Sequence, residues 1–219
     1  MGDRITSNLP GKVSRTRYNQ SHMSTPIQII PKIQSLELEA VGCWESLHMD
    51  FIPGVNIITG EPGSLGKTTI LASIMSEVSP DNAMGLVAPR LITGQSRIAV
   101  QLMPSEGAPR VVSSGEIPPK TDDESHGQYV MRILKSSLAT AEPDDAIIFD
   151  DEVLGRLDMP NCSKAVKWLN STTAQVICVA PRWIDLDVLP EARVFACSWD
   201  KERDQAEMRV RQQGQQTGP

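Results

Sequence analysis

Residues 60–69, GEPGSLGKTT, are of the types that bind the phosphates of a nucleotide. A phosphate-binding loop reads G-x-x-x-x-G-K-[ST]: backbone N–H groups surround the phosphates, the lysine reaches the β- and γ-phosphates, and the hydroxyl binds Mg²⁺. Lys67 and Thr68 directly follow Gly66, as the pattern requires, but five residues instead of four separate Gly60 from Gly66. The segment therefore predicts an ATP and Mg²⁺ site with one surplus residue in its loop.

The surplus residue leaves three interpretations: a working site with a bulge, a degenerate site, or a glycine-rich turn before an ordinary helix. We expect Leu65 to bulge outward while Gly63, Ser64 and Gly66 direct N–H groups at the phosphates, because glycines give the backbone enough freedom to absorb one residue. The expected cost is weaker binding or slower turnover.

Acidic residues follow a second apolar run, in AIIFDDE at residues 146–152. We expect a buried strand that ends in acid, because a phosphate-binding loop needs a carboxylate near the metal. Asp151 is the predicted metal partner, and Glu152 is the predicted general base for the attacking water. Asp150 is the alternative metal partner if the strand ends one residue earlier. The competing interpretation is that these acids only terminate the strand.

Hydrophobic periodicity predicts the elements that position these residues. Period-two alternation indicates two strands joined around Gly42, and the continuous apolar run at residues 55–59 indicates a buried strand before the glycine loop. Helical spacing follows the loop and recurs at residues 127–140, a hairpin is expected from residues 96–103 and 108–114, and AVKWLN belongs to a short helix. AQVICVA is a further strand, and ARVFACSW is expected to close the sheet. This order predicts an α/β fold: a mainly parallel sheet flanked by helices, with an antiparallel edge hairpin.

The two ends differ in composition from this core. Residues 1–23 are basic and contain Ser-His-Met, which indicates a cloning tag with Met23 as the natural start; a native basic arm is the alternative. Residues 200–219 predict a flexible polar tail, helical at best. The expected domain is therefore 31–199.

Composition excludes several classes of protein. The net charge of −6 argues against a broad nucleic-acid surface, and no apolar run approaches the roughly 18 residues of a membrane span. The four cysteines form no C-x-x-C pair and are expected to be buried thiols. We expect a cytoplasmic protein that has no membrane partner.

The order of motifs resembles the ABC-type ATPase heads, specifically the SMC/RecF/Rad50-like group, over roughly residues 31–199. Their opening pattern looks like IQSLELEAVGCWESLHMDFIPGVNIITG, and their signature, LSGGQ or LSxGE, resembles ESHGQ at residues 124–128, about twenty residues before the acidic strand. Their Leu-Asp of the D-loop resembles Leu157-Asp158, after Asp-Glu and four further residues.

The resemblance implies a mechanism that needs two heads. The signature of one subunit would cover the ATP on the P-loop of the other, so ATP would hold a homodimer together and hydrolysis would release it. The residues that the motifs and the resemblance together assign to nucleotide binding are Gly60, Gly63, Ser64, Gly66, Lys67, Thr68, Thr69, Ser125, Gly127, Gln128 and Asp158. Lys67 and Glu152 are assigned to catalysis, and Thr68 and Asp151 to the metal.

Departures from the family pattern refine this expectation. Besides the surplus loop residue, Glu124 and His126 replace the leading leucine and first glycine of the signature, and Pro181 stands near the position of the histidine that transporter subunits carry. Slow hydrolysis is therefore expected, in a head closer to the SMC type than to the transporter type. Only 84 positions separate Lys67 from Asp151, too few for coiled-coil arms, so this armless head is expected to switch a protein partner, with any DNA contact through that partner.

Two other functions are alternatives to the hypothesis of an ATPase head that dimerises on ATP. One is a hydrolysis-deficient nucleotide-binding scaffold protein. The other is a RecA-type helicase or partition ATPase, whose loops also resemble GEPG-x-GKTT but which does not need the segment at residues 125–128. An ATP-dependent dimer separates the leading hypothesis from both alternatives, and a ring-shaped oligomer would favour the RecA type.

Overall fold

The computed structural model describes residues 27–60, 66–79, 96–104, 120–181, 184, 186–203 and 205–212. The strands are β1 (Ile27–Pro31), β2 (Ile33–Val41), β3 (Trp44–Asp50), β4 (Val55–Gly60), β5 (Arg97–Leu102), β6 (Asp145–Phe149), β7 (Gln175–Val179), β8 (Arg193–Asp200) and β9 (Gln205–Gln212). The helices are α1 (Lys67–Val78), α2 (His126–Thr140), α3 (Asp151–Gly155) and α4 (Met159–Ser171), with a 3₁₀ turn, η2, at Leu186–Val188.

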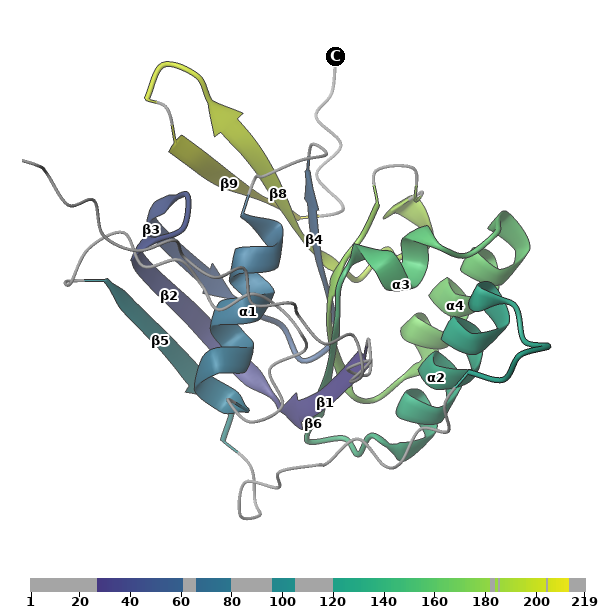
Figure 1. The fold of residues 1–219 in the computed structure, drawn as a ribbon. Coiled ribbons are helices and arrows are strands. Elements are labelled where there is room, and N and C mark those ends of the chain that lie inside the picture. The colour runs from purple at the N-terminus through teal and green to yellow at the C-terminus, as the bar shows by residue number, and fades with distance from the viewer. Residues whose placement is uncertain are drawn as a thin grey trace, which may run out of the picture.

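The central feature is a six-stranded sheet in the order β1-β6-β7-β4-β8-β9 (Figure 1). Its four inner strands are parallel to one another, whereas β1 and β9 pair antiparallel at the two edges. A second, antiparallel sheet has the order β3-β2-β5. The predicted α/β fold, with its mainly parallel sheet and flanking helices, is confirmed.

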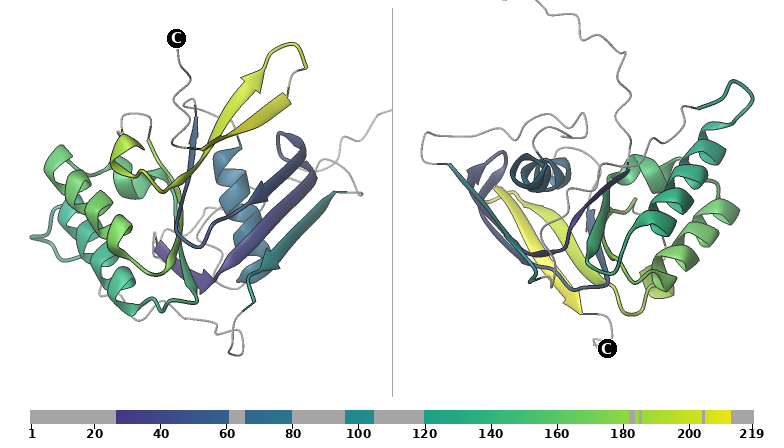
Figure 2. Two further views of the ribbon diagram at one scale, coloured as in Figure 1. Left: turned by 180° about the vertical axis from the view of Figure 1, so that it is seen from behind. Right: turned by 90° about the horizontal axis from the view of Figure 1, so that it is seen from below.

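The helices cover opposite faces of the six-stranded sheet (Figure 2). Successive residues of a strand point to opposite faces, so Ile57 of β4 packs with α2, α3 and α4, while the next residue, Ile58, packs with α1 and the three-stranded sheet. The inner strands are mainly apolar because both of their faces are buried. The arrangement places α1 on one side of the sheet and α2 on the other.

Buried amide side chains connect the two sheets. The Gln175 side chain is fully buried; its Oε1 accepts a hydrogen bond from the Ile33 N–H (2.8 Å), and its Nε2 donates to the carbonyl oxygens of Ile33 (2.9 Å) and Ile52 (2.8 Å). The Asn56 side chain, also fully buried, exchanges hydrogen bonds with the backbone of Ile52. These amides satisfy the backbone groups where the chain passes from one sheet to the other, which fixes the approach to β4.

Two boundaries differ from the sequence-based expectation. The strand predicted to run to residue 152 ends at Phe149, and Asp151 begins α3 instead. Carboxylates are unfavourable in a buried strand and favourable in the first turn of a helix, which explains this earlier end.

The expectation of a frayed or helical tail is wrong for Gln205–Gln212, which form β9. Ala206, Met208 and Val210 recur at every second position, a strand period that the surrounding charges obscure. As a result β9, and not β8, closes this edge of the sheet, and the fold extends beyond the expected range of 31–199 at both ends. The predicted leader, residues 1–23, and the second hairpin arm, residues 108–114, lie outside the described residues; the first arm is β5.

Among the described helices, none is both long enough and apolar enough to span a membrane.

Candidate functional site

Lys67 is the first residue of α1, and the residue before it has a conformation that favours glycine. Gly66 is the N-cap with φ 73° and ψ 7°, and no side chain caps the helix. The first helical hydrogen bond runs from the Ile70 N–H to the Gly66 carbonyl (3.0 Å). A helix start of this kind presents N–H groups and the positive end of the helix dipole to an anion. This geometry fits the phosphate role predicted for the segment.

The other end of the loop also depends on glycine. Gly60 ends β4 with φ 150°, and a Cβ there would collide with the carbonyl oxygen of Cys197 on the neighbouring strand β8. Residues 61–65, which include Gly63, Ser64 and the expected bulge at Leu65, lie outside the described residues. The two glycines that border the loop therefore occupy positions where a side chain would be strained or blocked.

The turn between β2 and β3 packs against the start of α1, a contact that the sequence does not predict. The Trp44 Nε1–H donates to the Gly66 carbonyl (3.2 Å), and a Cβ on Gly66 would collide with the Trp44 ring and the Cys43 sulfur. In the same turn, a Cβ on Gly42 would lie 3.0 Å from Cγ2 of Thr69. Trp44 is fully buried, so it contacts Gly66 from the interior of the protein. The Gly-Cys-Trp turn was visible in the sequence only as the link between two strands.

The exposures of the residues at the start of α1 differ. Thr68 is exposed, whereas Lys67 and Thr69 are half-buried. The Thr69 side chain lies against the Gly42 turn, while Thr68 is open to a ligand. This division favours Thr68 as the hydroxyl for a metal ion, as the motif predicts.

The acidic segment follows β6 at the same edge of the sheet as the glycine loop. Parallel strands end together: Phe149 is in register with Cys178, and Val179 with Ile58, so Asp150 and Gly60 extend from the same edge. One strand, β7, separates β6 from β4, which places the two strand ends about 10 Å apart. That spacing leaves room for a metal ion and phosphates between them.

The earlier end of β6 affects the choice between the two aspartates. The strand ends at Phe149, so Asp150 directly follows it. An end at this position is the condition under which the sequence favours Asp150 as the metal partner. Asp151 and Glu152 are the first two residues of α3, so they belong to a helix start and not to the strand. Both aspartates therefore stay candidates, and Glu152 stays the predicted general base.

The ESHGQ segment forms the start of α2, as expected. Ser125 is the N-cap: its hydroxyl accepts from the Gln128 N–H (3.2 Å), while Oε1 of Gln128 accepts from the Ser125 N–H (2.8 Å). This reciprocal pair is a capping box, which explains the Ser and Gln locally without any ligand. Ser125 and Gln128 are nevertheless exposed, and Gly127 is half-buried, so the segment is open to a second molecule.

Glu124, the residue that replaces the family's leucine, forms an ion pair. Its carboxylate accepts two hydrogen bonds from the guanidinium of Arg132, at 2.9 Å from Nε and 2.8 Å from Nη2. The hydrogen bond to Arg132 lowers the pKa of Glu124. Arg132 also lies over the ring of Tyr129, 5.4 Å from its centroid. The pair joins the loop before α2 to the second turn of that helix.

The Leu-Asp pair lies next to the ESHGQ segment. Leu157 is buried, and the exposed Asp158 is the N-cap of α4, where its carboxylate accepts from the Asn161 N–H (2.9 Å). A Cβ on Gly127 would lie 3.8 Å from the Arg156 carbonyl oxygen, so the two segments are neighbours. The N-cap hydrogen bond explains why an aspartate stands at position 158 without any ligand. Because this segment is next to Gly127, Asp158 and the ESHGQ segment lie on the same surface of the protein.

These segments fall into two groups on opposite faces of the sheet. Lys67 begins a helix that packs on one face, and Ser125 and Asp158 cap helices that pack on the other. Within the described residues, Gly60 and the end of β6 lie at the same edge of the sheet, whereas the helices that begin at Lys67 and after Ser125 pack on opposite faces.

Two of the four cysteines, Cys43 and Cys197, lie beside the glycines that border the loop. Cys162, Cys178 and Cys197 are buried, as expected, and Cys43 is half-buried. Burial raises the pKa of Cys178 to about 12 and that of Cys197 to about 11, the latter partly offset by the nearby Lys67 ammonium. Such thiols are poor nucleophiles. Within the described residues no group of three or more His, Cys, Asp or Glu could hold a metal ion by itself.

No protein-family model matches the sequence, and no curated protein matches it. Solved structures do match the fold, and two of them are SMC heads. The SMC head domain from Thermotoga maritima is 14% identical, with a TM-score of 0.52, over 81% of this chain and 98% of that one. The SmcHead bound to the C-winged helix domain of ScpA is 12% identical, with a TM-score of 0.56, over 83% of this chain and 98% of that one. The chain has the fold of an SMC/ABC-type ATPase head.

The SMC-head fold confirms the resemblance that the motifs indicated, at the level of the backbone. At this level of identity the likeness concerns the fold alone, so the roles of individual residues stay predictions.

Proposed function

We propose that this protein is an ATP-binding, slowly hydrolysing ATPase that forms a homodimer on ATP and thereby switches a protein partner. The observation that supports it most directly is the position of Lys67. It opens an uncapped helix after the left-handed Gly66, at the carboxyl edge of a parallel sheet. Conformations that favour glycine at both Gly60 and Gly66 support a loop that holds an anion rather than an incidental turn.

The residues at this edge fit Mg²⁺ and ATP in their donor types. Lys67 would supply a cation for the phosphates, Thr68 a hydroxyl for the metal, and Asp150 or Asp151 a carboxylate for the metal shell. Bound Mg²⁺ would neutralise charge on the β- and γ-phosphates. Glu152 would accept the proton of the attacking water. We further propose that Gly63 and Ser64 contribute N–H groups from the part of the loop outside the described residues.

Dimerisation is supported by what one chain lacks. Ser125, Gly127 and Gln128 lie on the opposite face from Lys67, and Asp158 lies beside them. We propose that a second copy brings these residues to the γ-phosphate. The N-terminus of α2 suits that anion, because its N–H groups and dipole would face the ligand.

Slow hydrolysis is supported by the departures in both motifs. The surplus loop residue adds freedom where the phosphates must be held, and the Glu124 carboxylate introduces negative charge beside the signature. One matched structure is an SMC head bound to a domain of ScpA, which supports the expectation that this head also acts through a protein partner. We place that partner in DNA maintenance, repair or defence, with any DNA contact made through it.

Nucleotide binding and light scattering together test the proposal. Titration calorimetry with ATP and Mg²⁺ should show binding to the wild-type chain and loss of binding in Lys67→Ala, with Lys201→Ala, on the exposed β8–β9 turn, unchanged. Glu152→Gln should accumulate an ATP-dependent dimer, and adding Ser125→Arg should abolish the dimer but keep ATP binding.

Each alternative function gives its own result in these measurements. ATP binding by the folded wild-type chain without hydrolysis and without an ATP-dependent dimer would support the scaffold alternative. A ring-shaped oligomer that persists in Ser125→Arg would support the RecA-type alternative.

A further inference from the structure

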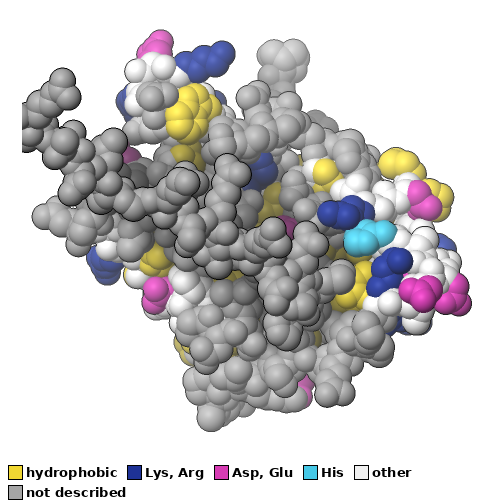
Figure 3. All heavy atoms as spheres, viewed as in Figure 1, with side chains coloured by type: hydrophobic (Ala, Val, Ile, Leu, Met, Phe, Trp, Pro, Cys, Tyr) yellow, Lys and Arg dark blue, Asp and Glu magenta, His cyan; other side chains and the backbone are white. Residues whose placement is uncertain are grey.

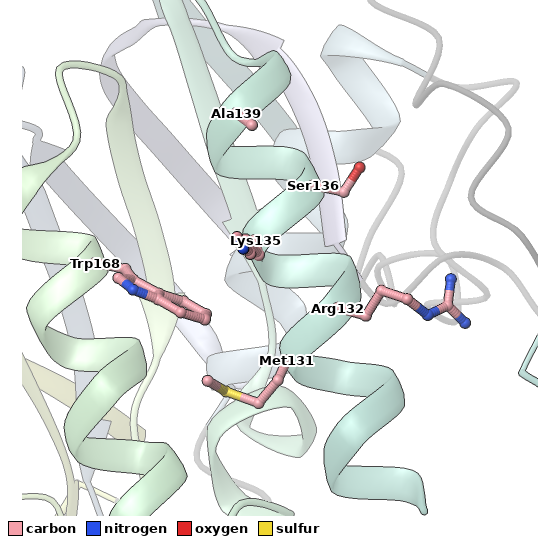
Figure 4. Close-up of a pocket in the computed structure, with 6 residues that line it drawn as sticks. All are labelled: Met131, Arg132, Lys135, Ser136, Ala139 and Trp168. Carbon is pink, nitrogen blue, oxygen red and sulfur yellow. The ribbon is translucent and has the colours of Figure 1, made fainter. Parts of the chain in front are cut away.

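A shallow groove of about 450 Å³ lies between α2 and α4, on the side of the sheet away from Lys67 (Figure 4). The residues that line it are Met131, Arg132, Lys135, Ser136, Ala139 and Trp168. In Figure 4 the Met131 and Trp168 side chains point toward each other across the groove, while Arg132 points away. The exposed surface of the groove is almost wholly carbon. It therefore offers an apolar floor to a ligand.

The two helices that form the groove are exclusively basic in their charges. They carry Arg132, Lys135, Lys164 and Lys167, and neither α2 nor α4 contains Asp or Glu, in a chain whose net charge is −6. Figure 3 shows basic and hydrophobic side chains next to one another on this side of the molecule, with acidic ones at its margin. The charge of these two helices is therefore opposite in sign to the net charge of the whole protein.

Helical spacing places lysines on both rims of the apolar floor. Met131, Lys135 and Ala139 are four residues apart and share one stripe of α2, and Lys164 is four residues before Trp168 on α4. Lys135 and Lys164 are both exposed, and within the described residues neither makes an ion pair. Arg132, in contrast, is engaged by Glu124.

We propose that this groove binds an amphipathic helical segment of a partner protein. Its apolar side chains would fill the space between Met131 and Trp168, and its carboxylates would pair with Lys135 and Lys164. An apolar stripe in a groove with charges at the rim is how helical peptides are recognised. Duplex nucleic acid fits less well, because a phosphate backbone gains nothing from a floor of carbon. The site contains no residue of the proposed nucleotide site, so it does not depend on ATP.

Fluorescence anisotropy with two designed peptides tests the proposal. Each peptide is a labelled helix of about five turns with the same apolar stripe, flanked either by glutamates or by lysines. The acidic peptide should bind the full wild-type chain at least about tenfold more tightly than the basic peptide, because its glutamates form ion pairs with Lys135 and Lys164. Lys135→Glu combined with Lys164→Glu should reverse that preference, while Lys201→Glu, on the β8–β9 turn, should not.

A further variant separates docking in the groove from simple charge attraction. Ala139→Arg adds a long side chain at an exposed helical position, so circular dichroism should show a folded protein. The arginine also leaves the groove positively charged, so a loss of acidic peptide cannot come from a loss of charge attraction. It should block the acidic peptide if the floor is used, and unchanged binding would overturn the proposal.

Other occupants of the groove give distinct results. Tight binding of a labelled DNA duplex or single strand, lost in the double lysine variant, without peptide binding, would overturn the proposal in favour of nucleic acid. Self-association of the wild-type chain that Ala139→Arg abolishes, again without peptide binding, would instead indicate a second copy.

Discussion

The indole N–H of Trp44 donates a hydrogen bond to the carbonyl oxygen of Gly66, with 3.2 Å between nitrogen and oxygen. This bond ties the turn of the three-stranded sheet to the residue immediately before Lys67. Gly66 is thus held by a side chain from more than twenty positions earlier in the chain. This buried aromatic residue supports the start of the helix that we propose as the phosphate site.

Trp44→Phe is expected to weaken ATP binding by roughly fivefold, because it deletes this hydrogen bond, which contributes about 1 kcal/mol. Titration calorimetry with ATP and Mg²⁺ measures the loss, and urea denaturation should show a fall in unfolding free energy of similar size. Trp168→Phe, on the far side of the sheet, is the control and should leave ATP affinity unchanged. Equal ATP affinity in Trp44→Phe and wild type would show that the bond is structural only.

The two aspartates after β6 can be separated by their metal dependence. Asp150 directly follows the strand, and Asp151 begins α3. Replacing the metal partner by asparagine should raise the Mg²⁺ concentration needed for ATP binding by about tenfold, while the other substitution should change it little. Titrating Mg²⁺ at fixed ATP, for Asp150→Asn and Asp151→Asn in parallel, identifies the partner. If neither variant shifts the midpoint, the segment does not serve the metal.

The sequence predicted the strand, loop and helix around Lys67 because apolar periodicity and glycine spacing are local signals. It also predicted a helix at residues 127–140, which overlaps ESHGQ, because apolar residues recur there at helical spacing. It could not predict the contact of Trp44 with Gly66 or the pairing of Glu124 with Arg132, because these depend on how elements pack and on rotamers. The strand β9 was missed because its charged flanks resemble a solvated tail.

The Glu124–Arg132 ion pair predicts a pH-dependent stability. The pKa of Glu124 is lowered in the folded protein by its hydrogen bonds to Arg132, so the pair stabilises the fold above the unfolded-state pKa and is lost as the pH falls through the folded-state pKa. Urea denaturation from about pH 5 to pH 3 should show a steeper loss of stability in wild type than in Glu124→Gln. Glu39→Gln, an exposed carboxylate on β2, is the control. Parallel curves for Glu124→Gln and wild type would contradict the role of the pair.

The Gln175 amide predicts the largest loss of stability. Gln175→Leu keeps a side chain of similar size but leaves the N–H and carbonyl of Ile33 without their buried partner, while the Asn56 amide still donates to the Ile52 carbonyl. An unsatisfied buried polar group costs about 1–3 kcal/mol, so a decrease of about 3 kcal/mol or more in unfolding free energy is expected. Urea denaturation measures it, with Gln101→Leu on the exposed strand β5 as the matched control. A decrease no larger than that of the control would mean that water or a backbone shift replaces the amide, and that the junction between the two sheets is held by apolar packing alone.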